Sequence, residues 1–144
     1  MKKLNNKGFS LVELIIVIAI MAVLIGVLAP QFLRYVERSR AQKDRTAVGE
    51  VENAIEISLA NEAIATAVNT AIAAGTAVTV NIDNTGAVTG TVADLTNDVI
   101  LTTSADLDFT SNTFTTAGIA IVCTVTGTPT TGFTITTTGL PIIP

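Results

Sequence analysis

The feature that most constrains this chain is an apolar run from Phe9 to Ala29, close to the N-terminus. Ser10 and Glu13 are its only polar side chains, and none occurs from Leu14 to Ala29. About 20 apolar residues are enough to cross the hydrocarbon core of a bilayer as a helix. The lysines that precede the run favour a cytoplasmic N-terminus. The sequence therefore predicts a single membrane-spanning helix near the start of the chain.

Three interpretations of this run differ in how they treat Glu13 and the short segment before it. A secretory signal peptide has a shorter apolar core and a small-residue cleavage site. The only such site, Val27-Leu28-Ala29, would cut directly before Pro30, which is an unfavourable junction. A plain membrane anchor explains the length, but a charge at helix depth costs about 2.5–3.5 kcal/mol on insertion scales. Neither of these two interpretations explains both Glu13 and the short basic leader, so a third kind of N-terminal segment has to account for both.

The composition excludes several classes of enzyme. The chain contains no His and no Trp, and Cys123 is its single cysteine. A Ser-His-Asp or Cys-His nucleophile therefore cannot form within this chain. A His/Cys zinc site and a disulfide framework need several such residues and are excluded as well. We expect no enzymatic activity, no cofactor and no catalytic residue.

The net charge of −4 conceals a strong asymmetry along the chain. All eight basic residues lie at or before Arg45, so residues 1–45 carry a net charge of +5. The remaining 99 residues contain no Lys or Arg and carry nine acids, giving −9. Nucleic-acid backbones require basic side chains, so binding of DNA or RNA by the downstream region is disfavoured.

The polar sequence after Pro30 keeps a helical pattern. We expect a helix from about Ser10 to about Ala60, with a bend near Pro30 because proline removes one backbone hydrogen bond. Spacing typical of one helical face places an apolar stripe on its second half. The stripe consists of Val48, Val51, Ile55 and Leu59.

Residues 61–75 are Ala-rich, with Asn61 as a plausible N-cap and Gly75 as a plausible stop. Whether they form a second helix or continue the first stays open at this stage. From residue 76 the chain is rich in Thr and Val, which predicts an antiparallel sheet of four or five strands. The 24 threonines, nearly all after residue 67, leave a sheet exterior that is polar and uncharged. This exterior is either solvated or, alternatively, glycosylated or densely packed. The expected strands are Thr76–Ile82, Ala87–Val92, Val99–Thr103, Ile119–Thr126 and Phe133–Thr138.

The junction Lys7-Gly8-Phe9-Ser10-Leu11-Val12-Glu13-Leu14 resembles the processing site of type IV prepilins. The resemblance covers roughly residues 7–60 and includes Pro30-Gln31-Phe32 and Tyr35. It implies cleavage between Gly8 and Phe9 by a prepilin peptidase, and methylation of the new N-terminal Phe9. Paired cysteines near the C-terminus and a Tyr-Pro element after the long helix, both frequent in pilins, are absent from this chain.

The same resemblance gives Glu13 a role in assembly. The family's partner for this glutamate is the freed amine of the N-terminal residue, here Phe9, on another subunit. A buried carboxylate and amine compensate their desolvation only in good geometry, so the pair would mainly set the register of subunits. Pro30 belongs to the same assembly segment.

Two charged belts on the long helix provide a second candidate for register. They are separated by about 14 residues, or about 21 Å of helix. Helices staggered along a fibre would bring one belt towards the other; the alternative is a solvated surface with weak pairs within one helix. The belts consist of Arg34, Arg38 and Arg45, and of Glu50, Glu52 and Glu56.

Three further candidates have less support from the sequence. Asp106 and Asp108, with Asp94 or Asp98, have the oxygen ligands that calcium prefers but no loop with ligand spacing, so we expect no metal site. Cys123 lies in an apolar strand and is expected to be a buried small hydrophobe. The few aromatic residues are better explained by packing than by electron conduction.

The sequence thus predicts an α+β protein in four segments: a leader (1–8), an apolar membrane and fibre-core helix (9–30), an amphipathic helical region (31–75) and a Thr-rich antiparallel β head (76–144). The resemblance implies a subunit of a type IV pilus-like filament. Its partners would be copies of itself, a prepilin peptidase, an assembly platform and, before assembly, membrane lipid. It would be a single-pass precursor in the cytoplasmic membrane and then part of a surface fibre. The alternatives are a pseudopilin of a type II secretion or competence system and a membrane-anchored binding module.

Overall fold

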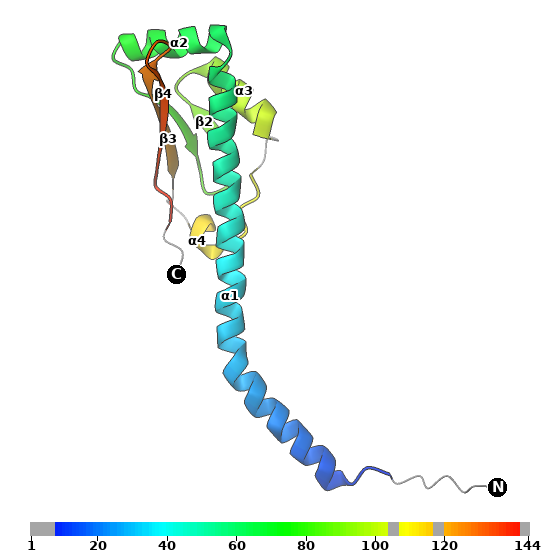
Figure 1. Cartoon of the computed structure of the whole chain (residues 1–144). Helices are drawn as coiled ribbons and strands as arrows, with labels where there is room; N and C mark the ends of the chain where they lie inside the picture. The colour runs from blue at the N-terminus through cyan, green and yellow to red at the C-terminus, as the bar shows by residue number, and fades with distance from the viewer. Residues whose placement is uncertain (1–7, 104–106, 117–119, 142–144) are drawn as a thin grey trace, which may run out of the picture. The chain divides into compact units, whose positions relative to one another are not determined.

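The computed structural model describes residues 8–103, 107–116 and 120–141. The chain divides into two compact units, Met1–Val36 and Glu37–Pro144. Helix α1 (Leu11–Leu59) supplies the only regular element described in the first unit and continues into the second (Figure 1). The other elements all belong to the second unit, which we call the head (Glu37–Pro144). These are α2 (Glu62–Ala73), β1 (Val78–Ile82), β2 (Val88–Gly90), α3 (Ala93–Thr103), α4 (Asn112–Thr115), β3 (Ile121–Thr128) and β4 (Gly132–Thr138).

Helix α1 has the extent predicted from the sequence and is not interrupted by Pro30. Proline lacks an N–H, so the carbonyl of Gly26 loses its usual partner four residues on. The loss of one backbone hydrogen bond does not interrupt a helix of 49 residues, since the neighbouring turns keep their hydrogen bonds. The bend expected near Pro30 stays a prediction.

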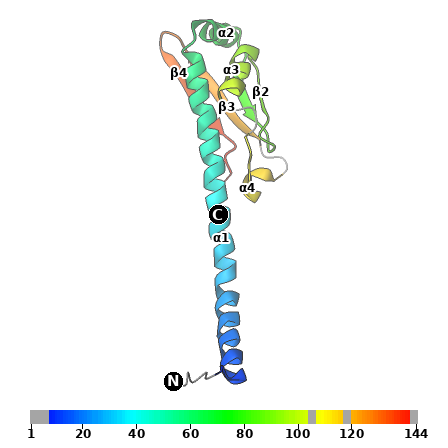
Figure 2. The same ribbon diagram turned by 90° about the vertical axis from the view of Figure 1, so that its right-hand side faces the viewer.

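The head contains one four-stranded antiparallel sheet in the order β2-β1-β3-β4. Alternate side chains of β1 and β3 are fully buried, because one face of the sheet is covered by helices. The central pair Val80 and Cys123 lie directly opposite each other in this layer. Figure 2 shows α1 and α3 on the same side of the sheet. The fold class is therefore α+β, with a long apolar N-terminal helix and a C-terminal antiparallel sheet.

The apolar stripe predicted on α1 forms part of the core of the head. Val51 and Ile55 are fully buried, and Val48 and Leu59 are at most 9% exposed. They join one hydrophobic cluster with the inward side chains of the sheet, with Leu95 and Val99 of α3, and with Phe114 of α4. Burying side chains of this size contributes about 1.5–3 kcal/mol each. This packing fastens the second half of α1 to the sheet.

Residues 61–75 form a separate helix, which resolves the alternative left open by the sequence. The Asn61 side chain accepts a hydrogen bond from the Ala63 N–H at 3.0 Å, as an N-cap does. At the other end, Gly75 has a φ of 77°, and its N–H bonds to the Ile72 carbonyl. The Thr76 N–H bonds to the Ala71 carbonyl, which completes a glycine-based helix stop.

The prediction of a strand at Val99–Thr103 is wrong, because these residues form the second half of α3. Leu95 and Val99 are four residues apart and both fully buried, so the segment presents one helical face to the core. A short apolar run does not distinguish strand from helix by itself. The other four strands are confirmed within two residues at each end, with Ile119 outside the described residues. Residues 76–144 also contain the helices α3 and α4, so the segment predicted as a β head is not composed of strands alone.

The turn after β1 depends on two residues, Asp83 and Gly86. One oxygen of Asp83 accepts bonds from the Thr85 N–H at 2.8 Å, the Thr85 hydroxyl at 2.6 Å and the Ala87 N–H at 3.0 Å. The hydroxyl bond and then the Thr85 backbone bond hold the pKa of Asp83 below its usual value. Gly86 has a φ of 86°, and a Cβ there would lie 1.9 Å from the Leu107 carbonyl oxygen. Only glycine fits this position without rearrangement.

Candidate processing and assembly site

The first unit exposes its apolar side chains on every side of the helix. From Leu11 to Leu28 the large apolar side chains are 50–74% exposed. The most apolar 18-residue window of α1 has a mean hydropathy of 3.1, and none of it is buried within the chain. By length and composition, α1 is the one helix among the described residues that is suited to cross a membrane. A helix that is apolar all round requires a surrounding of lipid or of other apolar helices.

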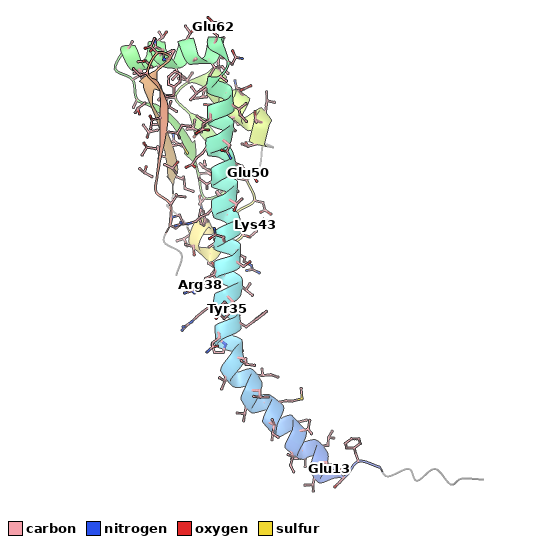
Figure 3. All side chains as sticks on the ribbon, viewed as in Figure 1. Glu13, Tyr35, Arg38, Lys43, Glu50 and Glu62 are labelled. Carbon is pink, nitrogen blue, oxygen red and sulfur yellow. The ribbon has the colours of Figure 1, made fainter. Side chains whose placement is uncertain are left out.

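Glu13 lies in the first turn of α1 (Figure 3) and caps the helix that carries it. Its Oε2 accepts a hydrogen bond from the Ser10 backbone N–H at 2.9 Å. The Ser10 hydroxyl in turn accepts the Val12 N–H at 3.4 Å. This reciprocal arrangement satisfies backbone donors that a helix start leaves unpaired. Glu13 therefore has a local structural role besides any role in docking.

Gly8 and Phe9 lie just before this cap and are not packed against the rest of the described chain. A Cβ built on Gly8 would have no atom within 4 Å, so the chain's own packing does not require glycine there. Phe9 is 90% exposed. Gly8, Phe9, Ser10 and Glu13 thus lie together at the start of an exposed apolar helix.

Two residues of the predicted charged belts bond to other elements of the head, and the remaining belt residues are exposed on α1. Arg45 donates from Nη2 to the Pro141 carbonyl at 2.8 Å, and Glu52 accepts a hydrogen bond from the Thr137 hydroxyl. These two side chains anchor α1 to β4 and to the segment after it. The exposed belt residues are Arg34, Arg38, Glu50 and Glu56, of which Figure 3 labels Arg38 and Glu50.

Two acidic residues with structural roles were not predicted. Asp44 is 1% exposed and accepts bonds from the Thr110 N–H at 3.1 Å and the Ser111 N–H at 2.9 Å. Glu37 accepts a bond from the Thr113 N–H at 3.3 Å. Asp44 falls four residues before Val48 on the buried stripe of α1. An acid on the extension of an apolar stripe was the signal that could have identified it.

The remaining candidates from the sequence do not form a site among the described residues. These residues contain no group of three or more side chains suited to a metal ion; Asp106 lies outside them. Cys123 is fully buried, as predicted, and burial raises the pKa of its thiol. Phe109 and Phe114 pack with ring centroids 5.3 Å apart in the core, whereas Tyr35 is 67% exposed.

Comparison with known proteins finds matches in the N-terminal part of the chain. Residues 3–29 match the family model described as the prokaryotic N-terminal methylation motif. The chain is 39% identical over 67 residues to prepilin peptidase-dependent protein A of Clostridium perfringens. It is 41% identical over 59 residues to the type IV major fimbrial protein FimA of Dichelobacter nodosus.

The chain therefore carries the prokaryotic N-terminal methylation motif, and its N-terminal part is similar to type IV fimbrial proteins.

The regions matched by these two relatives cover 46% and 41% of this chain. They cover 48% of the Clostridium protein and 37% of FimA, so the chain spans less than half of each relative. No solved structure matches the chain significantly. The likeness therefore concerns the apolar helix and the methylation motif at its start, and the head has to be interpreted from its own structure.

Proposed function

We propose that this protein is a structural subunit of a type IV pilus-like surface filament. The observation that carries the proposal is the apolar helix of the first unit, in which large side chains from Leu11 to Leu28 are at least half exposed. Nothing in the described part of the chain covers them. A bilayer satisfies this surface before assembly, and packing against the same helix of other copies satisfies it afterwards. The helix therefore loses little hydrophobic free energy when it leaves the membrane.

Proteolytic processing of the leader converts the membrane-inserted precursor into a subunit that can enter the filament. In this proposal a prepilin peptidase cuts between Gly8 and Phe9, and Phe9 becomes the methylated N-terminus. The glycine is not required by the chain's own packing, which supports a requirement imposed by an external enzyme. The leader lies on the cytoplasmic side and the head on the opposite side of the membrane. An assembly platform in the membrane then adds subunits to the base of the fibre.

Glu13 is the proposed docking charge, acting on the Phe9 amine of a neighbouring subunit. In the structure its carboxylate caps its own helix through the Ser10 N–H. The second carboxylate oxygen is available to an amine, so the two roles are compatible. A charge left unpaired in the apolar fibre core would be costly, and this cost selects the register in which every amine meets a carboxylate.

Two variants separate the docking role of Glu13 from its capping role. Glutamine at this position of a capping box still accepts the Ser10 N–H but carries no charge. Glu13→Gln should therefore be inserted and processed normally yet form few fibres, and Glu13→Ala should behave alike. Ser10→Ala weakens the cap and leaves the charge, so it should assemble nearly as well as the unaltered chain. Fibres in normal yield from Glu13→Gln would show that the charge is not used for docking.

The processing step has its own test. Intact mass and N-terminal sequencing of the native protein should show a chain that begins at Phe9 with a methylated amine. Gly8→Val should accumulate a longer precursor in the membrane fraction. A mature chain that begins at Met1 or Pro30 would contradict the proposal. Electron microscopy of the cell surface should show long filaments, whereas a pseudopilin would form a short rod.

The exposed belt residues are proposed as a further source of register. Arg34, Arg38, Glu50 and Glu56 remain on the surface of α1, and copies staggered along the fibre would bring opposite charges together. Exposed pairs contribute only about 0.2–1 kcal/mol each. Such pairs would influence the register of subunits because the same pair recurs between every two neighbouring copies along the filament.

A further inference from the structure

The two edges of the sheet differ in how they are protected. Strand β2, at one edge, has three residues, and helix α3 lies directly against it, since a Cβ built on Gly90 would meet the Thr96 hydroxyl. Strand β4, at the other edge, has seven residues and contains neither a charged residue nor a proline. Among the described residues, its backbone pairs only with β3. Short length, charged side chains and prolines usually protect a sheet edge, and β4 has none of these.

The side chains of β4 suit pairing with a further strand on both faces of the sheet. Thr134 and Thr136 are exposed on the outer face, where Thr136 lies opposite Thr124 of β3. Ile135, between them, is half-buried on the inner face and packs partly on the core. An added strand would extend the row of threonines on one face and cover the remaining apolar surface of Ile135 on the other.

We propose that the free edge of β4 pairs with the β4 edge of a second copy, antiparallel and about a two-fold axis at Ile135. Among the described strands, β4 is the long unprotected edge that a copy of this chain offers, because the short β2 edge lies against α3. The same edge serves both copies only in a two-fold, antiparallel arrangement. Ile135 then lies opposite its own counterpart, and Thr134 lies opposite Thr136 of the second copy. No like charges meet, because β4 carries no charge.

This contact goes beyond the proposed function, which concerns contacts along one filament. Copies along a filament repeat the same contact in one direction, whereas a two-fold contact is complete after two copies. The β4 pair therefore joins heads that belong to two different filaments. A pair of seven-residue strands is smaller than the interface of a stable dimer. Its strength would come from repetition along both filaments.

Thiol cross-linking of the full chain, purified in detergent at high concentration, tests the pairing without filaments. In Thr136→Cys the two thiols of a pair lie within about two strand spacings, or about 10 Å, so a bis-maleimide of that span should join two copies. The matched control is Thr124→Cys, which lies opposite Thr136 on the central strand β3. Its thiols would be at least three strand spacings, or about 14 Å, apart and should give about fivefold less dimer. Cys123 is fully buried and should not react.

An added lysine distinguishes pairing of the edges from chance encounters. Thr134→Lys in the Thr136→Cys chain should lower the yield of dimer about fivefold or more, because an edge lysine opposes pairing and occurs twice in a symmetric contact. Thr126→Lys adds the same charge on β3, directly opposite Thr134, and should change the yield by less than about twofold. Equal dimer from Thr136→Cys and Thr124→Cys, or an equal loss from the two lysine variants, would overturn the pairing.

Electron microscopy of surface filaments gives a second measurement. Filaments of the unaltered chain and of Thr126→Lys should lie side by side, whereas filaments of Thr134→Lys should lie singly and form in equal amount. Side-by-side filaments that persist in Thr134→Lys would refute the contact between filaments. A chain that forms no filament at all would contradict the proposed function alone, because the cross-linking experiment tests β4 by itself.

Discussion

Replacing Asp44 by alanine should destabilise the head more than any other single change to a charged residue of α1. The Asp44 side chain is 1% exposed. It accepts the backbone N–H groups of Thr110 and Ser111, at 3.1 and 2.9 Å, and the Thr110 hydroxyl at 3.3 Å. These donors lie directly before α4, so Asp44 fixes that segment against the helix. Without the carboxylate, the buried Ser111 N–H and the part-buried Thr110 N–H lose their acceptor.

The expected loss in the free energy of unfolding follows from these two N–H donors. A buried donor left without a partner costs about 1–3 kcal/mol. Two fully buried donors would give about 2–6 kcal/mol. The loss is smaller because the Thr110 N–H is part-buried and because the buried charge is removed. We expect a loss of about 2–4 kcal/mol in the free energy of unfolding of the head. Asp44→Asn keeps one acceptor oxygen and should lose about half as much.

Pulse proteolysis of the full chain in detergent, over a series of urea concentrations, measures this loss. Thermolysin is the suitable protease, because trypsin has no cleavage site after Arg45. Glu50→Ala is the matched control on the same helix, since Glu50 is exposed and its change should stay within about 0.5 kcal/mol. If Asp44→Ala and Glu50→Ala shift the urea midpoint equally, the assigned role of Asp44 is wrong.

Three further predictions concern the sheet and its turns. Gly86→Ala should cost at least about 2 kcal/mol in the same assay, because the new Cβ meets the Leu107 carbonyl in a backbone conformation that favours glycine. The lowered pKa of Asp83 means that its contribution to stability is present above the unfolded pKa and is lost as the pH falls through the folded pKa. An NMR titration should therefore give Asp83 a midpoint below 3.8, and an unshifted midpoint would contradict the turn bonds. Cys123 should react with maleimide slowly in the native protein at neutral pH and rapidly in urea, because burial both hides the thiol and raises its pKa.

Residues 46–144, the part of the head after Arg45, should also fail to bind duplex DNA at physiological salt. Residues 46–144 carry nine acids and no Lys or Arg, so they offer no cation to the phosphate backbone. A mobility-shift experiment with purified residues 46–144 checks this, because the full chain also carries the eight basic residues up to Arg45. Binding by residues 46–144 at micromolar concentration, weakening steeply with added salt, would contradict the prediction.

The features that the sequence predicted by itself rest on local physics. The apolar run and the position of Glu13 indicate the membrane helix, since length and polarity decide insertion without reference to the rest of the chain. The stripe on α1 predicted its buried face, because helical spacing maps sequence directly onto one side. The Asn61 cap and the Asp83 turn are likewise formed by residues within four positions of each other. The match to the methylation motif lies entirely within this local part.

The features that only the tertiary structure decided depend on distant partners. Asp44 bonds residues 66 and 67 positions away, Glu52 bonds one 85 positions away, and Arg45 one 96 positions away. Their spacing on α1 places two of them in a surface belt, yet the fold turns them towards β4 and the segment after it. Val99–Thr103 shows the same limit: its apolar residues suit a strand or a helix, and the space beside β2 selects the helix. Local sequence sets which face of an element is apolar, whereas the partner that meets a polar side chain is set by how the chain returns to it.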